Sequence, residues 1–502
     1  MKKSKLISHF FEDDDLIFIG CDDSDQHLLN KAYGGAKQSD LSLKDLIQDL
    51  PESASENPPA HIGAVTFSPT PVEEPPQKKA VFNPEKKLFE HLSDSHSIRK
   101  FGNLPYIRRG YVWLPVSEEV IGALLMESLS DEKSDIFQSG LADRVAKRIM
   151  YAYKFKEDSL VLPKHAVLFR NGVYDILSQE RIDAPPDNWF FPFAIHCDFT
   201  PDCRSECPVF DRFISQISNH DPETEELFMT FLAYCLMPGA QLKRLFVLGP
   251  EHDTGKSLLI EFLQHYVGEE QTTNIPLEKF HQNFALADIV GKSVVFSPEL
   301  PSDPLPSKAT IVAKNITGHD KIQIQQKYLK AFKYLPHAKI ICGTNHPIRS
   351  NDLPFWRRIL VLPCLNSIPP SMQDDELLEK LFAEEDAIMV KIMNAAREFI
   401  LNGMEFPYCA ASIAVKQDWQ KNNVPNLARF IEECCVLDPN ARSWSEDLHD
   451  AFADYCSVRG CSIPSVRAFV DAIKIGWPEL PHDRWSENGR QGRGFYGIKL
   501  LN

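Results

Sequence analysis

The stretch LFVLGPEHDTGKSLLIEFLQHY constrains this chain more than any other. Residues 245–248 form a short apolar strand, a polar loop follows Gly249, and Gly255-Lys256-Ser257 then opens an amphipathic helix. A strand, a loop and a helix in this order are the context that a phosphate-binding loop needs. In such a loop, backbone N–H groups surround phosphate oxygens and the helix N-terminus adds positive potential. The less favoured alternative is a chance Gly-Lys-Ser at a helix start.

The residue types predict roles within this loop. Lys256 would reach the β- and γ-phosphates of ATP, and the Ser257 hydroxyl would be a ligand of Mg²⁺. The usual motif is G-x-x-x-x-G-K-S/T, whereas five residues rather than four separate Gly249 from Gly255. Either the loop carries an insertion, or Pro250 stands in place of the first glycine and the first turn is rebuilt. The whole predicted nucleotide-binding set is Gly249, Pro250, Glu251, His252, Asp253, Thr254, Gly255, Lys256 and Ser257.

Short apolar strands alternate with helices between residues 241 and 365, which is typical of a mainly parallel sheet buried on both faces. Glu299 stands just beyond the strand 294–296, where an acid lies near Mg²⁺ and the attacking water. The strand 339–342 delivers Asn345 to the C-terminal edge of the sheet, where it can bind the γ-phosphate or position water. Taken alone, Glu299 reads as a solvated loop residue and Asn345 as a loop cap.

Two arginines, Arg357 and Arg358, precede the next strand in FWRRILVLP. An arginine at such a position can reach the γ-phosphate of a neighbouring subunit and stabilise transition-state charge. The alternative for either residue is an ordinary surface ion pair.

These signals follow one another between residues 249 and 358. The motifs GPEHDTGKS, VGKSVVFSPELP, ITGHDKIQIQQKYLKAFKYLPHAKIICGTNHP and FWRRILVLP together resemble the superfamily 3 helicases, specifically the phage/plasmid primase–helicase family. The likeness extends over roughly residues 120–502 and is strongest in the middle. It implies an AAA+ ATPase core that uses ATP and Mg²⁺, assembles into a ring, usually a hexamer, and translocates on DNA.

The resemblance also implies roles by motif match. Glu299 would be the Walker B acid and, with Ser257, a metal ligand, and Asn345 would be the sensor. Arg357 or Arg358 would be the intersubunit finger, with Arg358 preferred. The candidate catalytic residues are therefore Lys256, Glu299, Asn345, Arg357 and Arg358.

The expected fold class is α/β: an AAA+ ATPase core with a parallel sheet, preceded by a mainly helical domain and followed by a winged-helix-like domain. Apolar spacing predicts that residues 81–165 are mostly helical, that a hairpin turns at Asn171-Gly172, and that two helices meet at Asp221-Pro222. Helical patterns between 424 and 476 precede a final strand at 494–501. The expected domains are an acidic, Pro-rich arm and linker at 1–80, a mainly helical α+β helicase-associated domain at 81–207, the ATPase at 208–400, and the winged-helix-like domain at 401–502.

The net charge of −16 excludes passive binding to polyanions, so DNA contacts need local basic patches. Residues 300–360 hold ten Lys/Arg against three Asp/Glu. The resemblance implies that this region forms a hairpin facing the ring pore, where lysines would follow single-stranded DNA; a solvated basic face is equally open for any one lysine. The hairpin candidates are Lys321, Lys327, Lys330 and Lys333, interleaved with Tyr328, Phe332 and Tyr334.

A second basic patch lies near the end of the sequence, in DRWSENGRQGRGFYGIKL, and would suit a wing lying along a duplex backbone. An ordinary exposed turn is the alternative. Its candidates are Arg490 and Arg493, with Arg484 and Lys499 beside them.

Composition bounds the remaining possibilities. The 12 cysteines are scattered, which favours free thiols and a cytoplasmic, reducing environment. No apolar run is long enough to cross a membrane, and the N-terminus has no signal-peptide pattern. His196, Cys197, Cys203 and Cys207 lack the paired spacing of a zinc site, so structural zinc is disfavoured.

The leading hypothesis is an ATP-dependent DNA helicase or replication initiator of a phage, plasmid or other mobile element, acting as a homo-hexamer. The first 110 residues are too short and proline-rich for a primase domain, so a separate primase or polymerase is an expected partner. The alternative is a nucleotide-gated DNA-binding scaffold with little or no hydrolysis. A regulator that acts through the acidic arm is the least supported hypothesis.

Overall fold

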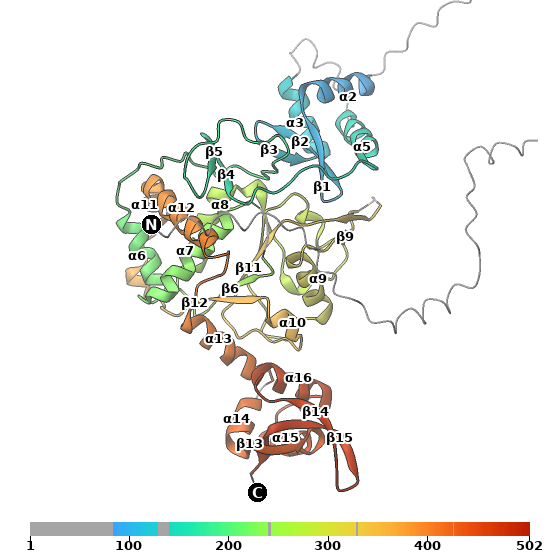
Figure 1. Cartoon of the computed structure of the whole chain (residues 1–502), viewed down its shortest axis with the longest axis vertical. Helices are drawn as coiled ribbons and strands as arrows, with labels where there is room; N and C mark the ends of the chain where they lie inside the picture. Colours follow the sequence, from blue (N-terminus) through green and yellow to red (C-terminus); the bar gives the residue numbers. More distant parts are fainter. Residues whose placement is uncertain (1–83, 129–139, 239–241, 328–329, 425, 502) are drawn as a thin grey trace, which may run out of the picture. The chain divides into compact units, whose positions relative to one another are not determined.

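The computed structural model describes residues 84–128, 140–238, 242–327, 330–424 and 426–501. The acidic arm that the sequence predicts at 1–80 therefore lies outside the described residues. These elements form a mixed α/β structure around one parallel sheet (Figure 1).

The central sheet has five parallel strands in the order β12-β6-β11-β8-β7. Four of them were predicted from apolar runs and are confirmed, whereas β7 has three residues of the sequence TTN and carries no apolar signal. The strands are β6 (Leu245–Pro250), β7 (Thr272–Asn274), β8 (Val294–Ser297), β11 (Lys339–Gly343) and β12 (Ile359–Cys364).

Both faces of this sheet are covered by hydrophobic cores. Strand β6 contributes to both cores, because its successive side chains point to opposite faces. Phe246 and Leu248 of β6 enter one hydrophobic core, whereas Leu245 and Val247 enter another. The first core includes side chains of α6 (Pro208–Ile217), α7 (Pro222–Leu236), α8 (Lys256–Val267) and α12 (Glu385–Leu401), and the second includes those of α9 (Ser307–Thr317) and α10 (Leu353–Trp356). Shorter elements beside them are β9 (Ile322–Ile324), β10 (Phe332–Tyr334) and α11 (Leu377–Phe382).

The predicted break between α6 and α7 is confirmed. Asp221 is the N-cap of α7, where its Oδ2 accepts a hydrogen bond from the Thr224 N–H at 3.1 Å, and Pro222 occupies the first turn. A capping carboxylate followed by proline is a strong start signal for a helix.

The expectation that residues 81–165 are mostly helical is wrong for 98–115, which form a three-stranded antiparallel sheet. The turns of this sheet use Gly102, Asn103 and Gly110, all with positive φ, so a turn signal was present in the sequence. The predicted hairpin at Asn171-Gly172 is confirmed. The elements are α2 (Pro84–Ser95), β1 (Ile98–Phe101), β2 (Leu104–Arg109), β3 (Val112–Pro115), α3 (Glu118–Ser128), α5 (Leu141–Tyr153), β4 (Ala166–Phe169) and β5 (Gly172–Asp175).

The C-terminal elements enclose a separate hydrophobic core that includes Phe430, Phe452, Phe469 and Phe495. The three predicted helical patterns are confirmed, but the final strand begins at Arg490, and β13, with its proline and charged residues, was missed. The elements are α13 (Ala410–Lys421), α14 (Leu427–Cys434), β13 (Cys435–Trp444), α15 (Ser445–Arg459), α16 (Val466–Gly476), β14 (His482–Glu487) and β15 (Arg490–Leu500). The three strands pair antiparallel in the order β13-β15-β14.

Among the residues described, no helix combines the length and the apolarity needed to span a bilayer.

Candidate nucleotide-binding site

The loop between β6 and α8 begins later than the sequence motif suggests. Strand β6 continues through Pro250 and α8 starts at Lys256, so four residues lie between Pro250 and Gly255. This geometry favours a rebuilt first turn over an inserted residue. Gly249 has a different reason to be glycine: a Cβ there would lie 2.7 Å from the carbonyl oxygen of Thr344. A side chain at Gly249 would therefore disturb the contact between β6 and the end of β11.

The segment after β12 holds the loop in place. The Ser367 hydroxyl donates to the carbonyl of His252 at 2.7 Å, and the Ile368 N–H donates to the carbonyl of Asp253 at 2.8 Å. Gly255 takes a φ of 92° at the start of α8, a conformation that favours glycine. The loop backbone is thereby fixed around the exposed helix N-terminus.

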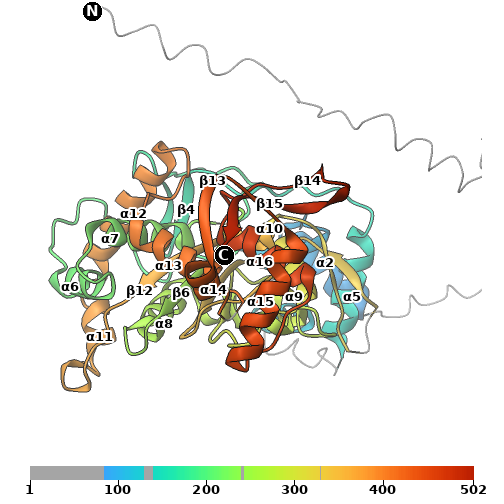
Figure 2. The same ribbon diagram turned by 90° about the horizontal axis from the view of Figure 1, so that it is seen from below.

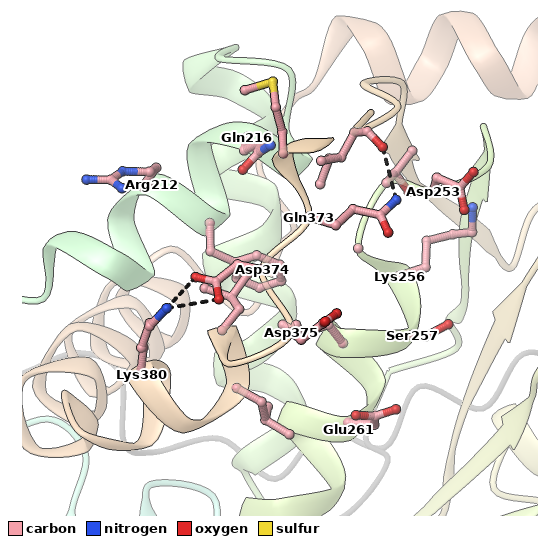
Figure 3. Close-up of a pocket in the computed structure, with 18 of the residues that line it drawn as sticks. Arg212, Gln216, Asp253, Lys256, Ser257, Glu261, Gln373, Asp374, Asp375 and Lys380 are labelled. Atoms are coloured by element: carbon pink, nitrogen blue, oxygen red, sulfur yellow. Dashed lines mark hydrogen bonds and ion pairs between the residues drawn. The ribbon is translucent and has the colours of Figure 1, made fainter. Parts of the chain in front are cut away.

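Lys256 and Ser257 occupy the first positions of α8. The Lys256 ammonium donates to the carbonyl of Glu251 and lies beside Asp253 (Figure 3). Partial burial lowers the pKa of Lys256, while neighbouring charges oppose this shift. Ser257 is exposed, and its hydroxyl has no hydrogen bond within the described ranges. The first N–H groups of α8 also lack partners within the helix, so this helix end suits an anion.

A cavity of about 810 Å³ opens beside this helix end. Its lining includes loop residues from His252 to Ser257, side chains of α6 and the segment from Ile368 to Lys380 (Figure 3). Phe213 and Met372 contribute apolar surface, whereas other lining residues are polar. This volume and mixed lining are typical of a site for a small organic ligand.

The ends of β8 and β11 meet the same edge of the sheet. The Thr344 N–H donates to the carbonyl of Leu248 at 3.0 Å, and the Leu300 N–H donates to the carbonyl of Gly343 at 2.9 Å. These bonds place Asn345 close to the loop, where it lines the cavity with a buried Oδ1 that has no partner in the part of the chain described.

Glu299 lies at this edge but is not among the residues that line the cavity. Its carboxylate is exposed and makes no ion pair or hydrogen bond within the described residues. Of the predicted site residues, the structure thus brings His252 to Ser257 together with Asn345. Glu299 stands nearby, and Gly249, Pro250 and Glu251 lie outside the lining.

Arg357 and Arg358 lie at the opposite edge of the sheet. Ile359, the first residue of β12, pairs with Leu245, the first residue of β6, whereas the loop follows the last residue of β6. At about 3.3 Å per residue, the two edges are about 17 Å apart along β6. Neither arginine lines the cavity of its own chain.

The two arginines differ in their surroundings. Arg358 donates from Nη1 to the Lys314 carbonyl at 2.6 Å and to the Thr317 hydroxyl at 2.7 Å, so it binds the last turn of α9. The Arg357 side chain is exposed and makes no hydrogen bond or ion pair within the described residues.

The predicted basic hairpin is present, because β9 and β10 pair antiparallel. Its aromatic residues do not share one role: Tyr334 is fully buried and its hydroxyl accepts from the Gly291 N–H at 2.9 Å, while Phe332 packs against the core. Tyr328 lies outside the described residues. The candidate lysines are all exposed and have no ion pair within the described ranges: Lys321, Lys327, Lys330 and Lys333.

The C-terminal arginines also differ from one another. Arg490 forms ion pairs with Glu446 at 3.1 Å and Asp447 at 2.8 Å, and its guanidinium lies 5.0 Å from the centre of a Trp444 ring. Arg493 is exposed and lies directly opposite Arg484 across the strand pair. Two like charges in this register repel each other.

The cysteines considered for zinc belong to the interior. Cys197 and Cys207 are buried in the core that includes α6, and burial raises the pKa of both thiols. Across the described ranges, no group of three His, Cys, Asp or Glu is placed to hold a metal.

Sequence patterns missed much of the cavity wall. Arg212 and Gln216 come from α6, while Gln373, Asp374 and Asp375 come from the segment before α11 (Figure 3). No motif marks these residues, because they meet only after the chain has folded across more than 150 positions.

A family of unknown function, DUF5906, matches residues 247–358. The chain is 26% identical over 223 residues to Putative helicase L207/L206 of Acanthamoeba polyphaga mimivirus, an alignment that covers 39% of this chain and 21% of that protein. It is 29% identical over 257 residues to Putative helicase 184R of Invertebrate iridescent virus 6, covering 47% of this chain and 25% of that protein. The chain thus spans about a fifth to a quarter of the length of these relatives.

Solved structures of the NrS-1 C-terminal region are also similar. An A-form apo structure has 12% sequence identity and a TM-score of 0.41, covering 82% of this chain and 99% of that chain. A second apo structure has 13% identity and a TM-score of 0.40, covering 83% and 100%.

Proposed function

We propose that this chain is an ATP-driven DNA helicase or replication initiator of a phage, plasmid or other mobile element, with a superfamily 3 AAA+ core. The observation that carries the proposal is the cavity at the N-terminus of α8, which Asn345 also lines. The names of the two viral relatives support a helicase-like role.

The residues at the site suit a nucleotide with Mg²⁺. The free N–H groups of α8 and the Lys256 ammonium would bind the phosphates. Mg²⁺ accompanying a nucleotide takes few protein ligands, and the unpartnered Ser257 hydroxyl and Glu299 carboxylate fit that need. When bound, the ion would neutralise phosphate charge. Asn345, whose Oδ1 is buried without a partner, would accept from a water through that oxygen and donate from Nδ2 to a phosphate oxygen.

Arg357 is the better candidate for the intersubunit finger. Arg358, which the sequence argument preferred, already binds the end of α9. Arg357 is free to contact a neighbouring subunit. Because it lies at the far edge of the sheet, it would not reach a nucleotide bound in the cavity of its own chain. Hydrolysis would therefore need two protomers, which fits a homo-hexameric ring.

The domain proposals follow the same reasoning. The helicase-associated domain would include the elements from α2 to β5, and the ATPase would include those from α6 to α12. The C-terminal order α14-β13-α15-α16-β14-β15, with its three-stranded sheet, supports the winged-helix proposal. The cysteines described are all free, which fits the proposed cytoplasmic location. A separate primase or polymerase remains the proposed partner.

ATP hydrolysis by Lys256→Ala tests the catalytic assignment. We expect this variant to lose about 100-fold or more of the DNA-stimulated rate, because the main phosphate-binding cation is removed. Lys279→Ala, which removes an exposed lysine outside the cavity lining, is the matched control and should keep its rate. Circular dichroism checks that both variants fold. Undiminished hydrolysis by Lys256→Ala would refute the assignment.

The nucleotide-gated scaffold remains a second candidate, favoured by Pro250 in place of the first glycine and by Glu299 outside the cavity lining. Tight ATP binding by the unmodified protein, with no turnover on single-stranded or duplex DNA, would select it.

A further inference from the structure

The end of α5 presents two large aromatic side chains to solvent. Tyr151 is 75% exposed and Phe155 is 89% exposed. They are four positions apart, Tyr151 in the last turn of α5 and Phe155 in the turn that follows it. Single exposed apolar residues are ordinary, but two exposed rings at one end of a helix mark a candidate binding surface.

Lysines accompany these rings. The Lys154 ammonium lies 5.2 Å from the centre of the Phe155 ring, and the Lys156 ammonium lies 3.7 Å from the centre of the Tyr153 ring. We call these residues, 151 and 153–156, the α5 platform. Exposed rings for base stacking and cations for phosphates are the combination that binds single-stranded nucleic acid.

A buried lysine hydrogen-bonds to the backbone of the α5 platform. Lys100 of β1 is 7% exposed, and its ammonium donates to the carbonyl of Lys154 at 3.2 Å and to that of Lys156 at 2.8 Å. These bonds satisfy two backbone carbonyls in the turn that follows α5. The rings therefore stand on a fixed backbone, which lowers the entropy lost on binding.

The segment that follows the α5 platform and the basic hairpin both hydrogen-bond to one turn, that of Asn103. The Asn103 N–H donates to the Asp158 carboxylate at 3.3 Å, and the Asn103 Nδ2 donates to the Lys333 carbonyl at 3.0 Å. Gly102 accepts from the Leu335 N–H at 3.1 Å. Figure 1 shows α5 and β9 on the same side of the fold, and Figure 2 shows α5 from below.

We propose that the α5 platform is a second contact for single-stranded DNA, continuous with the hairpin lysines. Tyr151 and Phe155 stack on bases, and Lys154 and Lys156 contact the adjoining phosphates. The inference rests on the proposed function, because that function makes DNA the ligand. The lysines beside the aromatic rings favour DNA over an apolar protein segment, because they add cations to surfaces on which bases can stack.

Binding of fluorescein-labelled oligo(dT) to the full chain tests the proposal by fluorescence anisotropy. We expect Tyr151→Ala with Phe155→Ala to raise Kd about tenfold or more, since each stacked base contributes measurably to affinity. Restoring one ring as Phe155→Trp should recover much of the affinity. Binding to a blunt duplex should stay unchanged, because paired bases cannot stack on these rings. Tyr408→Ala, which removes an aromatic side chain that is 68% exposed elsewhere, is the matched control and should not change Kd.

Two results would overturn the inference: oligo(dT) affinity that survives the double alanine change, or equal weakening of single-stranded and duplex binding. Failure of the wild-type chain to bind oligo(dT) would also overturn it. ATP hydrolysis measured without DNA separates the two claims, because that rate depends on the cavity and not on the platform. A chain that hydrolyses ATP and binds oligo(dT), but whose affinity survives the double alanine change, loses only the platform.

Discussion

Arg357 and Arg358 show how two adjacent, chemically identical side chains acquire different roles. Arg358 donates to a carbonyl and to a hydroxyl at the end of α9, so its removal takes one hydrogen bond from each of those groups. Arg357 has no such partner in the described part of the chain. Sequence position alone did not distinguish them, because the partners of Arg358 lie more than 40 residues earlier.

Arg357→Ala should lower kcat for ATP hydrolysis about 1,000-fold, because an arginine supplied to a transferring phosphoryl group stabilises its transition state. ATP affinity and Tm should stay the same. Arg358→Ala should instead reduce the free energy of unfolding by about 1–3 kcal/mol. Steady-state kinetics and thermal melts of both variants check the assignment, and the reverse pattern would restore Arg358 as the finger.

His337 is a buried histidine whose two ring nitrogens have no hydrogen-bond partner within the described residues. It packs against Phe101 and Phe190, with ring centres 6.1 and 5.3 Å away. Burial lowers the pKa of His337 to about 3, and the nearby Lys339 adds to this shift. The folded protein therefore holds this ring neutral under conditions in which the unfolded chain would protonate it.

This pKa shift predicts that the free energy of unfolding depends on pH. The unfolded chain binds the proton below a pKa of about 6.5, whereas the folded chain binds it only near 3, so His337 costs stability increasingly as pH falls between those values. His337→Phe should therefore gain about 2 kcal/mol in the free energy of unfolding at about pH 5, relative to its effect at about pH 8. Denaturant titrations at both pH values measure this difference. A difference that is independent of pH would contradict the prediction.

At the scale of elements, apolar runs and turn signals were enough for the central strands and for the helices α6, α7, α15 and α16. They failed for β7, which has no apolar residue, and for β1–β3, whose glycine turns were passed over in favour of a helical pattern. The loop before α8 was recognisable because one motif contains it. The wall made by Gln216 and Gln373 was not, because tertiary packing alone brings these residues together.

The β9–β10 hairpin should set the salt dependence of single-stranded DNA binding. Lys330→Ala with Lys333→Ala should weaken binding and reduce the slope of log K against log salt by about 1.4, if each lysine neutralises one phosphate. ATP hydrolysis without DNA should not change. An unaltered slope would show that these lysines are an ordinary solvated face.

The C-terminal strand pair β14–β15 carries two arginines with different surroundings: Arg490 forms ion pairs, whereas Arg493 forms none within the described residues. Arg493→Ala should weaken duplex binding and reduce the salt slope by about 0.9, because its charge has no carboxylate partner within the described residues. Arg490→Ala should change duplex affinity less, since Glu446 and Asp447 already bind this guanidinium. Anisotropy with labelled duplex checks both, and a larger effect at Arg490 would reverse the assignment.

At the scale of the whole molecule, the separation of Arg357 from its own cavity predicts that ATP hydrolysis depends on assembly of several subunits. The rate of ATP hydrolysis per subunit should rise with protein concentration and level off as rings form, with mass photometry of the same samples showing the species present. Full activity of a monomer would contradict this expectation.

Mixing two inactive variants tests the same arrangement. Rings that contain both Lys256→Ala and Arg357→Ala subunits hold some interfaces with an intact Lys256 and an intact Arg357. Such mixtures should regain part of the activity that neither variant has alone. Mixtures that stay inactive, while native mass spectrometry shows mixed rings, would exclude action between subunits.

Strand β12 begins directly after the two arginines and ends shortly before Ser367 and Ile368, which hold the backbone of the loop before α8. It is hydrogen-bonded along its length to β6, so its two ends are rigidly connected. In the proposed ring, the arginine end of β12 would contact the nucleotide of the neighbouring subunit. The other end would shift the loop that binds the nucleotide of the same subunit. We therefore expect the timing of hydrolysis to pass mechanically from one subunit to the next.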